Sequence, residues 1–316
     1  MQIMGLLQTA LELGLISALT VLALFLSYTM LDICDLSTDG CFTLGATVGA
    51  VTALAGHPYL SIPAAMLAGV SSGFIVALLQ TKMGINSLLA GIIVNTGLYS
   101  VNIAIMGNAS LLNMNKTETV FTRAKDALAG TVLAGQSKLL IALAAVILVI
   151  LFQVFFLKTR IGLAIRATGD NPDMVRASSI NPVITTIIGL CIANAFTALS
   201  GALLAQSQKS VNIDIGTGMV TIALASLLIG RAFLGRGKIG TQAVGAVLGA
   251  FVFRLVYTIA LRFNLPAYML KLISSVIVIL AIAGPYFKSR IPVYTRRMKH
   301  QSAGAPALSE GGKEVR

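Results

Sequence analysis

The sequence predicts an all-α fold, a polytopic bundle of transmembrane helices. Of its 316 residues, 56% are hydrophobic and only 11% are charged, whereas soluble domains carry roughly 25% charged residues. Apolar runs of about 20 residues recur along the chain, and a run of that length can cross a bilayer as a helix. We therefore expect one membrane domain, residues 1–287, followed by a basic and disordered tail, residues 288–316.

About nine spans are expected, some of them broken or half helices. The first run, residues 12–31, has no basic stretch before it, which favours a span over a cleavable signal peptide. The other runs are expected at residues 38–55, 60–80, 85–106, 138–157, 183–206, 217–230, 239–261 and 268–287.

The distribution of Lys and Arg predicts the orientation of these spans, because cytoplasmic loops of membrane proteins are enriched in positive charge. With the N-terminus outside, 15 of the 23 Lys and Arg residues fall in cytoplasmic segments and 7 in external ones, while Arg254 lies inside a span. The cytoplasmic segments are then residues 32–37, 81–84, 158–182, 231–238 and 288–316. Topology and anionic lipid explain the net charge of +12 better than nucleic acid does.

The most basic loop between two spans, residues 158–182, carries helix signals of its own. Asn171 can cap a helix that has Pro172 at its first position and Asp173 in its first turn. Such a helix would offer a surface to a soluble partner. A solvated basic loop between two spans fits the same residues equally well.

Three carboxylates, Asp32, Asp35 and Asp39, gather where the second span begins. Polar residues here, such as Ser37, can cap a helix N-terminus. Gly40 permits an irregular backbone, which at membrane depth lines a cavity or is buried in protein. The stretch is thus either an ordinary helix cap or part of a substrate pathway.

Glycines mark two further features. The segments 213–230 and 235–257 are short or interrupted by Gly, as are the broken helices beside transport paths. Three GxxxG pairs in apolar runs predict close helix packing. These pairs are Gly45–Gly49, Gly69–Gly73 and Gly245–Gly249.

Polar residues inside the expected spans are the candidates for a substrate pathway. Buried amides such as those of Asn95 and Asn194 often bond neighbouring helices, whereas an ionised residue within a span suggests function. Arg254 can contact a substrate carboxylate, pair with Asp214 or extend to the outer surface. The candidate pathway residues are Asp39, Asn95, Asn194 and Arg254.

No catalytic or metal-binding motif is apparent. The three cysteines form no CxxC pair, and the chain has neither an HExxH motif nor a nucleotide-binding P-loop. None of the eleven acids falls in the middle of an expected span, which argues against an ion-coupled secondary transporter, because such proteins keep an intramembrane acid. The external loop Gly107–Ser137 is either a mobile connector or a docking surface for a binding protein.

Five stretches carry a resemblance to a known family. They are LDICDLSTDGCFTLGA, LLAGIIVNTGLYSVNIAIMG, RIGLAIRATGDNPDMVRASSIN, ALSGALLAQ and LKLISSVIVILAIA. The chain resembles the permeases of ABC importers, in the superfamily of ribose and branched-chain amino acid permeases. Within it, the chain is most similar to the branch linked to tryptophan and other aromatic amino acids. In that branch an acidic residue is expected after Ile229 and Gly230. This chain has the basic residues Arg231, Arg236 and Lys238 there instead.

The resemblance implies a transporter subunit, not an enzyme, in a bacterial inner membrane with its C-terminus in the cytoplasm. Two permease chains would form the pathway for a small solute, an amino acid such as an aromatic one, or alternatively a sugar or nucleoside. A separate ATPase dimer would hydrolyse ATP, so this chain would need no cofactor, and an external lipoprotein would deliver the substrate. The loop 158–182 would dock on the ATPase through Arg166, Gly169, Asp170, Asn171, Pro172, Met174 and Arg176.

Overall fold

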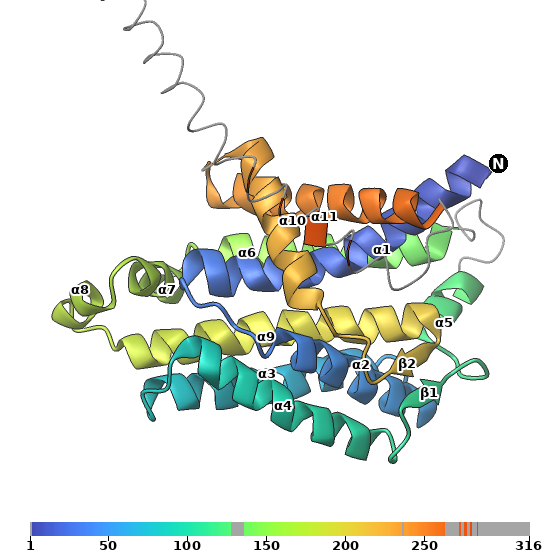
Figure 1. Cartoon of the computed structure of the whole chain (residues 1–316), viewed down its shortest axis with the longest axis horizontal. Coiled ribbons are helices and arrows are strands. Elements are labelled where there is room, and N and C mark those ends of the chain that lie inside the picture. The colour runs from blue at the N-terminus through green and yellow to red at the C-terminus, as the bar shows by residue number, and fades with distance from the viewer. Residues whose placement is uncertain are drawn as a thin grey trace, which may run out of the picture.

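The computed structural model describes residues 2–127, 136–235 and 237–262, together with the isolated positions 272, 275, 276, 279 and 283. Across these residues the chain is a bundle of helices with one two-stranded β-ribbon (Figure 1). Six of the described helices are long and apolar enough to cross a membrane, which confirms the predicted helical membrane bundle. The count of nine spans is not confirmed, because most of the expected span 268–287 and the whole tail lie outside the described residues.

The described elements follow the predicted spans closely. In chain order they are α1 (Gln2–Leu24), the π-helix η1 (Phe25–Met30), α2 (Thr38–Leu54), α3 (Ser61–Thr81), α4 (Ser87–Ile105), β1 (Leu111–Asn113), α5 (Val120–Ala127), α6 (Ser137–Phe156), α7 (Arg160–Asp170), α8 (Pro172–Ala177), α9 (Pro182–Gln208), β2 (Ser210–Asn212), α10 (Met219–Leu234) and α11 (Ile239–Arg262).

Helices α1 and α9 form the centre of the bundle. In their most apolar stretches 78% of the residues are buried, against 33% or less in α3, α4, α6 and α11. The outer helices keep large exposed apolar side chains such as Ile92, Leu148 and Phe155. Lipid tails are as apolar as these side chains, so their exposure is expected in a membrane.

The three GxxxG pairs all lie at helix contacts, as predicted. Gly69 and Gly73 of α3 face the backbone of α9 at Asn194 and Leu190, and a β-carbon at either glycine would collide with that backbone. The pair on α2 also faces α9, and the pair on α11 faces α10. Helices approach this closely only where one of them lacks side chains.

The two ends of the bundle carry different elements (Figure 1). Helices α7 and α8 lie together at one end, and the N-terminus, α5 and the β-ribbon lie at the other. In the ribbon, Leu112 of β1 pairs with Val211 of β2 in antiparallel register. The loop 158–182 and the N-terminus are therefore at opposite ends, as the alternation of spans predicts.

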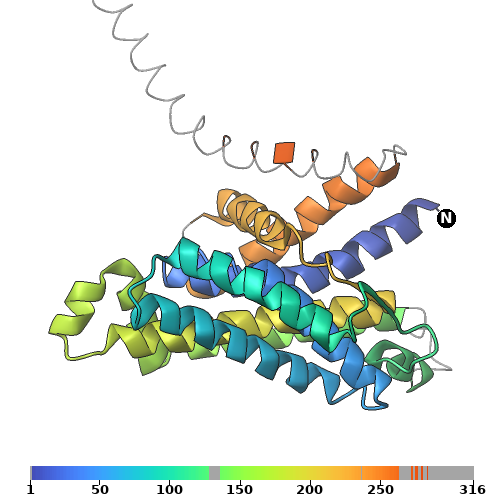
Figure 2. The ribbon, with the colours of Figure 1, turned by 60° about the horizontal axis from the view of Figure 1, so that its bottom comes forward.

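Helices α2 and α10 are shorter than the six candidate spans, and we call them the half helices. A helix rises about 1.5 Å per residue, so the 17 residues of α2 and the 16 of α10 are shorter than the hydrocarbon core of roughly 30 Å. Figure 2 shows α10 and α11 packed on α1, on the other side of the bundle from α3.

Residues 31–37 are not the surface loop that the sequence suggested. After η1 the chain turns back into the bundle, where Asp35 is only 2% exposed and bonds to Asn194 near the middle of α9. Asp35, which the sequence placed in a loop between two spans, is therefore a buried acid beside the middle of α9. A short polar segment between two apolar runs has the same appearance in the sequence whether it stays at the surface or re-enters.

Candidate functional site

A polar pocket of about 410 Å³ opens where α2, α4 and the turn before α10 meet. Two of the predicted pathway residues, Asp39 and Asn95, line it. We call it the junction pocket. Its lining residues are Asp39, Gly40, Thr43, Asn95, Thr96, Tyr99, Ser100, Asn102, Ile213, Asp214 and Thr217.

Asp39 joins the two half helices. It lies in the first turn of α2, and its two carboxylate oxygens accept hydrogen bonds from the backbone amides of Gly218 at 2.9 Å and Val220 at 2.8 Å. The first amides of a helix have no partner within the helix, and they interact favourably with a carboxylate. Gly218 begins α10 with a φ of 85°, a conformation that glycine adopts without strain. Asp39 of α2 thus caps the N-terminus of α10.

Two asparagines of α4 pack around Gly40. Asn102 is 1% exposed and donates from Nδ2 to the carbonyl oxygen of Gly40 at 3.2 Å. Asn95 lies against Gly40 so closely that a β-carbon there would come within 2.6 Å of its Oδ1. Thr96, Tyr99 and Ser100 were not among the predicted pathway residues, although together with Asn95 and Asn102 they repeat at helical spacing along one apolar span.

Asn194 lies behind the pocket and does not line it. Its Nδ2 donates to Asp35 Oδ2 at 2.8 Å, and the backbone amide of Ser37 donates to Asp35 Oδ1 at 2.8 Å. These bonds satisfy a carboxylate that would otherwise be costly to bury. They also fix the chain just before α2, and so position Asp39.

Arg254 is apart from the other three candidates. It lies on α11 against Gly14 of α1, and its guanidinium stacks over Tyr257, 5.5 Å from the ring centroid. Its buried Nε has no hydrogen-bond partner, and no ion pair joins it to Asp214 among the described residues. The predicted pairing of Arg254 with Asp214 is therefore not found.

The loop 158–182 folds into two helices, α7 and α8. The predicted cap is confirmed: Asn171 Oδ1 accepts from the amides of Asp173 and Met174, both at 3.1 Å, and Pro172 begins α8. Met174 is 66% exposed, while Val175 is buried. Of the seven residues predicted to contact an ATPase, five are exposed at this end, namely Asp170, Asn171, Pro172, Met174 and Arg176; Arg166 and Gly169 are half-buried.

Two glycines connect this loop to the end of the first span. A β-carbon on Gly169 of α7 would overlap the carbonyl oxygen of Met30, and one on Gly189 of α9 would overlap the side chain of Leu31. Thr168 and Thr185 share a hydrogen bond of 2.8 Å between α7 and α9. The loop is therefore packed on η1 and α9 and is not a free connector.

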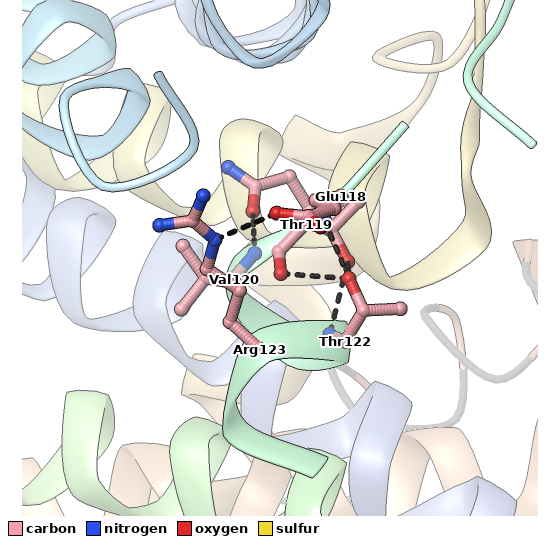
Figure 3. Close-up of polar contacts among 6 residues, drawn as sticks. Glu118, Thr119, Val120, Thr122 and Arg123 are labelled. Atoms are coloured by element: carbon pink, nitrogen blue, oxygen red, sulfur yellow. Dashed lines mark hydrogen bonds and ion pairs between the residues drawn. The ribbon is translucent and has the colours of Figure 1, made fainter. Parts of the chain in front are cut away.

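At the opposite end, α5 begins in a tight polar cluster (Figure 3). Thr119 and Thr122 cap each other, with their backbone amides donating to each other's Oγ1 at 2.6 and 3.2 Å. The amide of Val120 donates to Gln206 of α9 at 2.9 Å. Arg123 bonds Glu118 at 2.9 Å, and this hydrogen bond raises the pKa of the guanidinium.

The comparisons with known proteins agree with this architecture. The family model for the permease component of branched-chain amino acid transport systems matches residues 6–282. A tyrosine transport system permease protein of Clostridioides difficile is 30% identical over 271 residues, which cover 85% of this chain and 88% of that protein. An uncharacterized protein of Rickettsia prowazekii is 32% identical, covering 89% and 98%.

More distant relatives include a sugar permease. The galactose/methyl galactoside import permease of Escherichia coli is 26% identical over 68% of this chain and 62% of its own length. No solved structure matches the chain. A subunit of this family is an integral membrane protein and not an enzyme, since a separate ATPase hydrolyses ATP, and the family implies a substrate-binding protein as a further partner. The chain belongs to the branched-chain amino acid permease family, the membrane subunits of ABC transporters.

Proposed function

We propose that this chain forms the translocation pathway of an importer for an amino acid, with the junction pocket as the point of passage. The single observation that carries the proposal is this polar pocket at the meeting point of two half helices. Polar side chains inside a membrane protein are rare and face a pathway or another helix. Half helices that end near mid-depth are a common way to build such a pathway.

A second permease chain completes the pathway in this proposal. Thr96, Tyr99 and Ser100 are exposed on α4 next to the pocket, between exposed apolar residues such as Ile92. Lipid offers these polar groups no hydrogen bonds. A water-filled space between two copies of α4 offers them, and a homodimer is the simplest assembly that places two such faces together.

The ATPase docks at α8 in this proposal. The exposed Met174 and Asp170 at the tip of the loop supply the contact, and the loop lies in the cytoplasm with the N-terminus outside. The 15 to 7 division of Lys and Arg supports this orientation. The polar cluster at the start of α5 then lies on the outer face, where a binding lipoprotein delivers the substrate.

A series of contacts from α7 to the pocket suggests how ATPase movement reaches the substrate. Gly169 packs on Met30, the chain then runs to Asp35, and Asp39 holds α10. A displacement of α7 therefore acts on the segment that positions both half helices. The nucleotide shifts this equilibrium by as much as its affinity differs between the two states of the pathway.

The name of the relative from Clostridioides difficile supports an aromatic amino acid as the substrate, and the galactose permease makes a sugar the second candidate. The test is ATP-driven uptake. The chain is reconstituted in liposomes with its partner ATPase and binding protein, and radiolabelled tyrosine, leucine and galactose are offered in turn. We expect tyrosine or leucine to accumulate only with an ATPase that hydrolyses ATP. Accumulation of galactose in their place would overturn the assignment.

A further inference from the structure

We propose that the junction pocket binds its ligand through a positively charged ammonium group. This inference rests on the proposed function and refines it, because it names the chemical feature that the permease itself recognises. It separates amines and amino acids from sugars, which carry no charge.

The charge of the pocket points to a cation. Its described lining residues include two carboxylates, those of Asp39 and Asp214, and no Lys, Arg or His. Asp214 is exposed at the pocket and makes no ion pair within the described part of the chain. Acidic side chains with no basic neighbour create a negative potential, which attracts cations and repels anions.

A second observation concerns hydrogen bonding. Asn102 is 1% exposed, and its Oδ1 has no partner among the described residues, although its Nδ2 is bonded to Gly40. A buried acceptor without a donor is costly. The Asp39 oxygens each accept one backbone amide and retain lone pairs for further donors. These acceptors can take further donors, and an ammonium group has three and accepts none.

Tyr99 is a further lining residue whose side chain can attract a cation. It is 50% exposed and lines the pocket beside these acceptors. The face of an aromatic ring attracts a cation within about 6 Å of its centre. A sugar can only donate hydrogen bonds to the two carboxylates, whereas an ammonium group donates hydrogen bonds and also neutralises their charge.

The experiment measures protection of a single cysteine at the pocket. Ser100→Cys is introduced after Cys34, Cys41 and Cys191 are changed to Ala, and the full chain is purified in lipid nanodiscs. The rate of alkylation by N-ethylmaleimide is followed with L-tyrosine, tyramine, 4-hydroxyphenylpropionate or galactose present. Tyramine and 4-hydroxyphenylpropionate share a ring and differ in carrying an ammonium or a carboxylate group.

We expect L-tyrosine and tyramine to slow alkylation by about tenfold at ten times their Kd, as mass action requires. The other two compounds leave the rate unchanged. Asp214→Asn weakens protection by tyramine by about tenfold or more, because it removes a charged hydrogen-bond partner. The control Asp126→Asn removes an exposed acid on α5 and leaves the protection intact.

Three results would each overturn the inference: no protection by tyramine, equal protection by 4-hydroxyphenylpropionate or galactose, or unchanged protection in Asp214→Asn. Uptake in liposomes tests the proposed function separately. Tyrosine uptake without ammonium-dependent protection retracts only the inference, whereas galactose uptake in place of amino acids retracts the proposed function.

Discussion

The α-carbon of Gly169, in the loop between the fifth and sixth predicted spans, lies directly against the carbonyl oxygen of Met30, the last residue of η1. No side chain fits between these two backbones. The contact joins the loop predicted to dock on an ATPase to the segment that leads into Asp35 and Asp39. A π-helix is rare and frequently occurs at functional sites, and η1 forms the other side of this contact.

Replacing Gly by Ala within a helix normally favours the helix. Gly169→Ala should nevertheless impair transport. The added methyl group forces α7 away from η1, an overpacking cost of about 1–3 kcal/mol. We expect a lower melting temperature and weaker coupling, measured as ATP hydrolysed per substrate molecule taken up. Gly97→Ala on α4 is the matched control, because no atom lies within 4 Å of its added β-carbon. Equal behaviour of the two variants would show that the contact with Met30 has no role.

The double variant Asp170→Ala with Met174→Glu should weaken association with the ATPase while membrane insertion stays intact. Met174 is exposed on a capped helix, and a charge there is costly to bury in an interface. Co-purification with the ATPase and substrate-stimulated hydrolysis measure the effect. Met83→Glu changes a methionine of similar exposure, 68% against 66%, in the turn between α3 and α4. If Met83→Glu reduces co-purification as much as the double variant does, α8 has no special place in docking.

Asp35 and Asn194 should behave as a coupled pair. Asn194→Ala leaves a buried carboxylate short of a donor, which costs about 1–3 kcal/mol. The double variant Asp35→Ala with Asn194→Ala should lose less stability than the sum of the two single variants. Melting temperatures in detergent give the comparison. Additive losses would mean that the hydrogen bond contributes nothing beyond the packing of each side chain.

Arg254 and Asp214 should be energetically independent. No ion pair joins them in the described structure, and Arg254 lies on α11 over Tyr257, outside the junction pocket. The effects of Arg254→Gln and Asp214→Asn on melting temperature and uptake should therefore add within about 0.5 kcal/mol. If one substitution instead rescues the other, Arg254 and Asp214 do form the ion pair that the sequence suggested.

The orientation can be tested by labelling cysteines in a cysteine-free background. Ser110 lies beside the β-ribbon and Ser178 at the end of α8, at opposite ends of the bundle. An impermeant maleimide added to intact cells should modify Ser110→Cys and spare Ser178→Cys, and both should react after lysis. Ser302→Cys, in the tail outside the described residues, should behave like Ser178→Cys. Labelling of Ser178→Cys from outside would reverse the topology.

The loop 158–182 was more predictable from the sequence than the junction pocket. Helix capping depends on neighbouring residues only. The start of α8 could therefore be predicted from three consecutive residues, Asn171, Pro172 and Asp173. The positions of Asp35 and Asp39 depend on partners more than 150 residues away in the chain. Hydropathy marked the spans but treated residues 31–37 as a surface loop, because a re-entrant segment is stabilised by tertiary contacts that leave no local pattern.

Arg254 was selected as a pathway candidate for its charge alone. A charge inside a span suggests that the residue has a function, but it does not tell in which direction the side chain points. The polar residues of α4 carried the better signal, since several of them share one face of an otherwise apolar helix. A search for polar periodicity within apolar spans would have found Tyr99 and Ser100.

The hydrogen bond between Asp35 and Asn194 also constrains the order of events during synthesis. The two residues are 159 positions apart, and ribosomes add about 5–20 residues per second. The first span and the acidic residues that follow it thus enter the membrane roughly 10–30 s before α9 has been synthesised. During that interval Asp35 has to remain in water or in the shelter of the insertion machinery. The half helix α2 reaches its final depth only after the later part of the chain has been made.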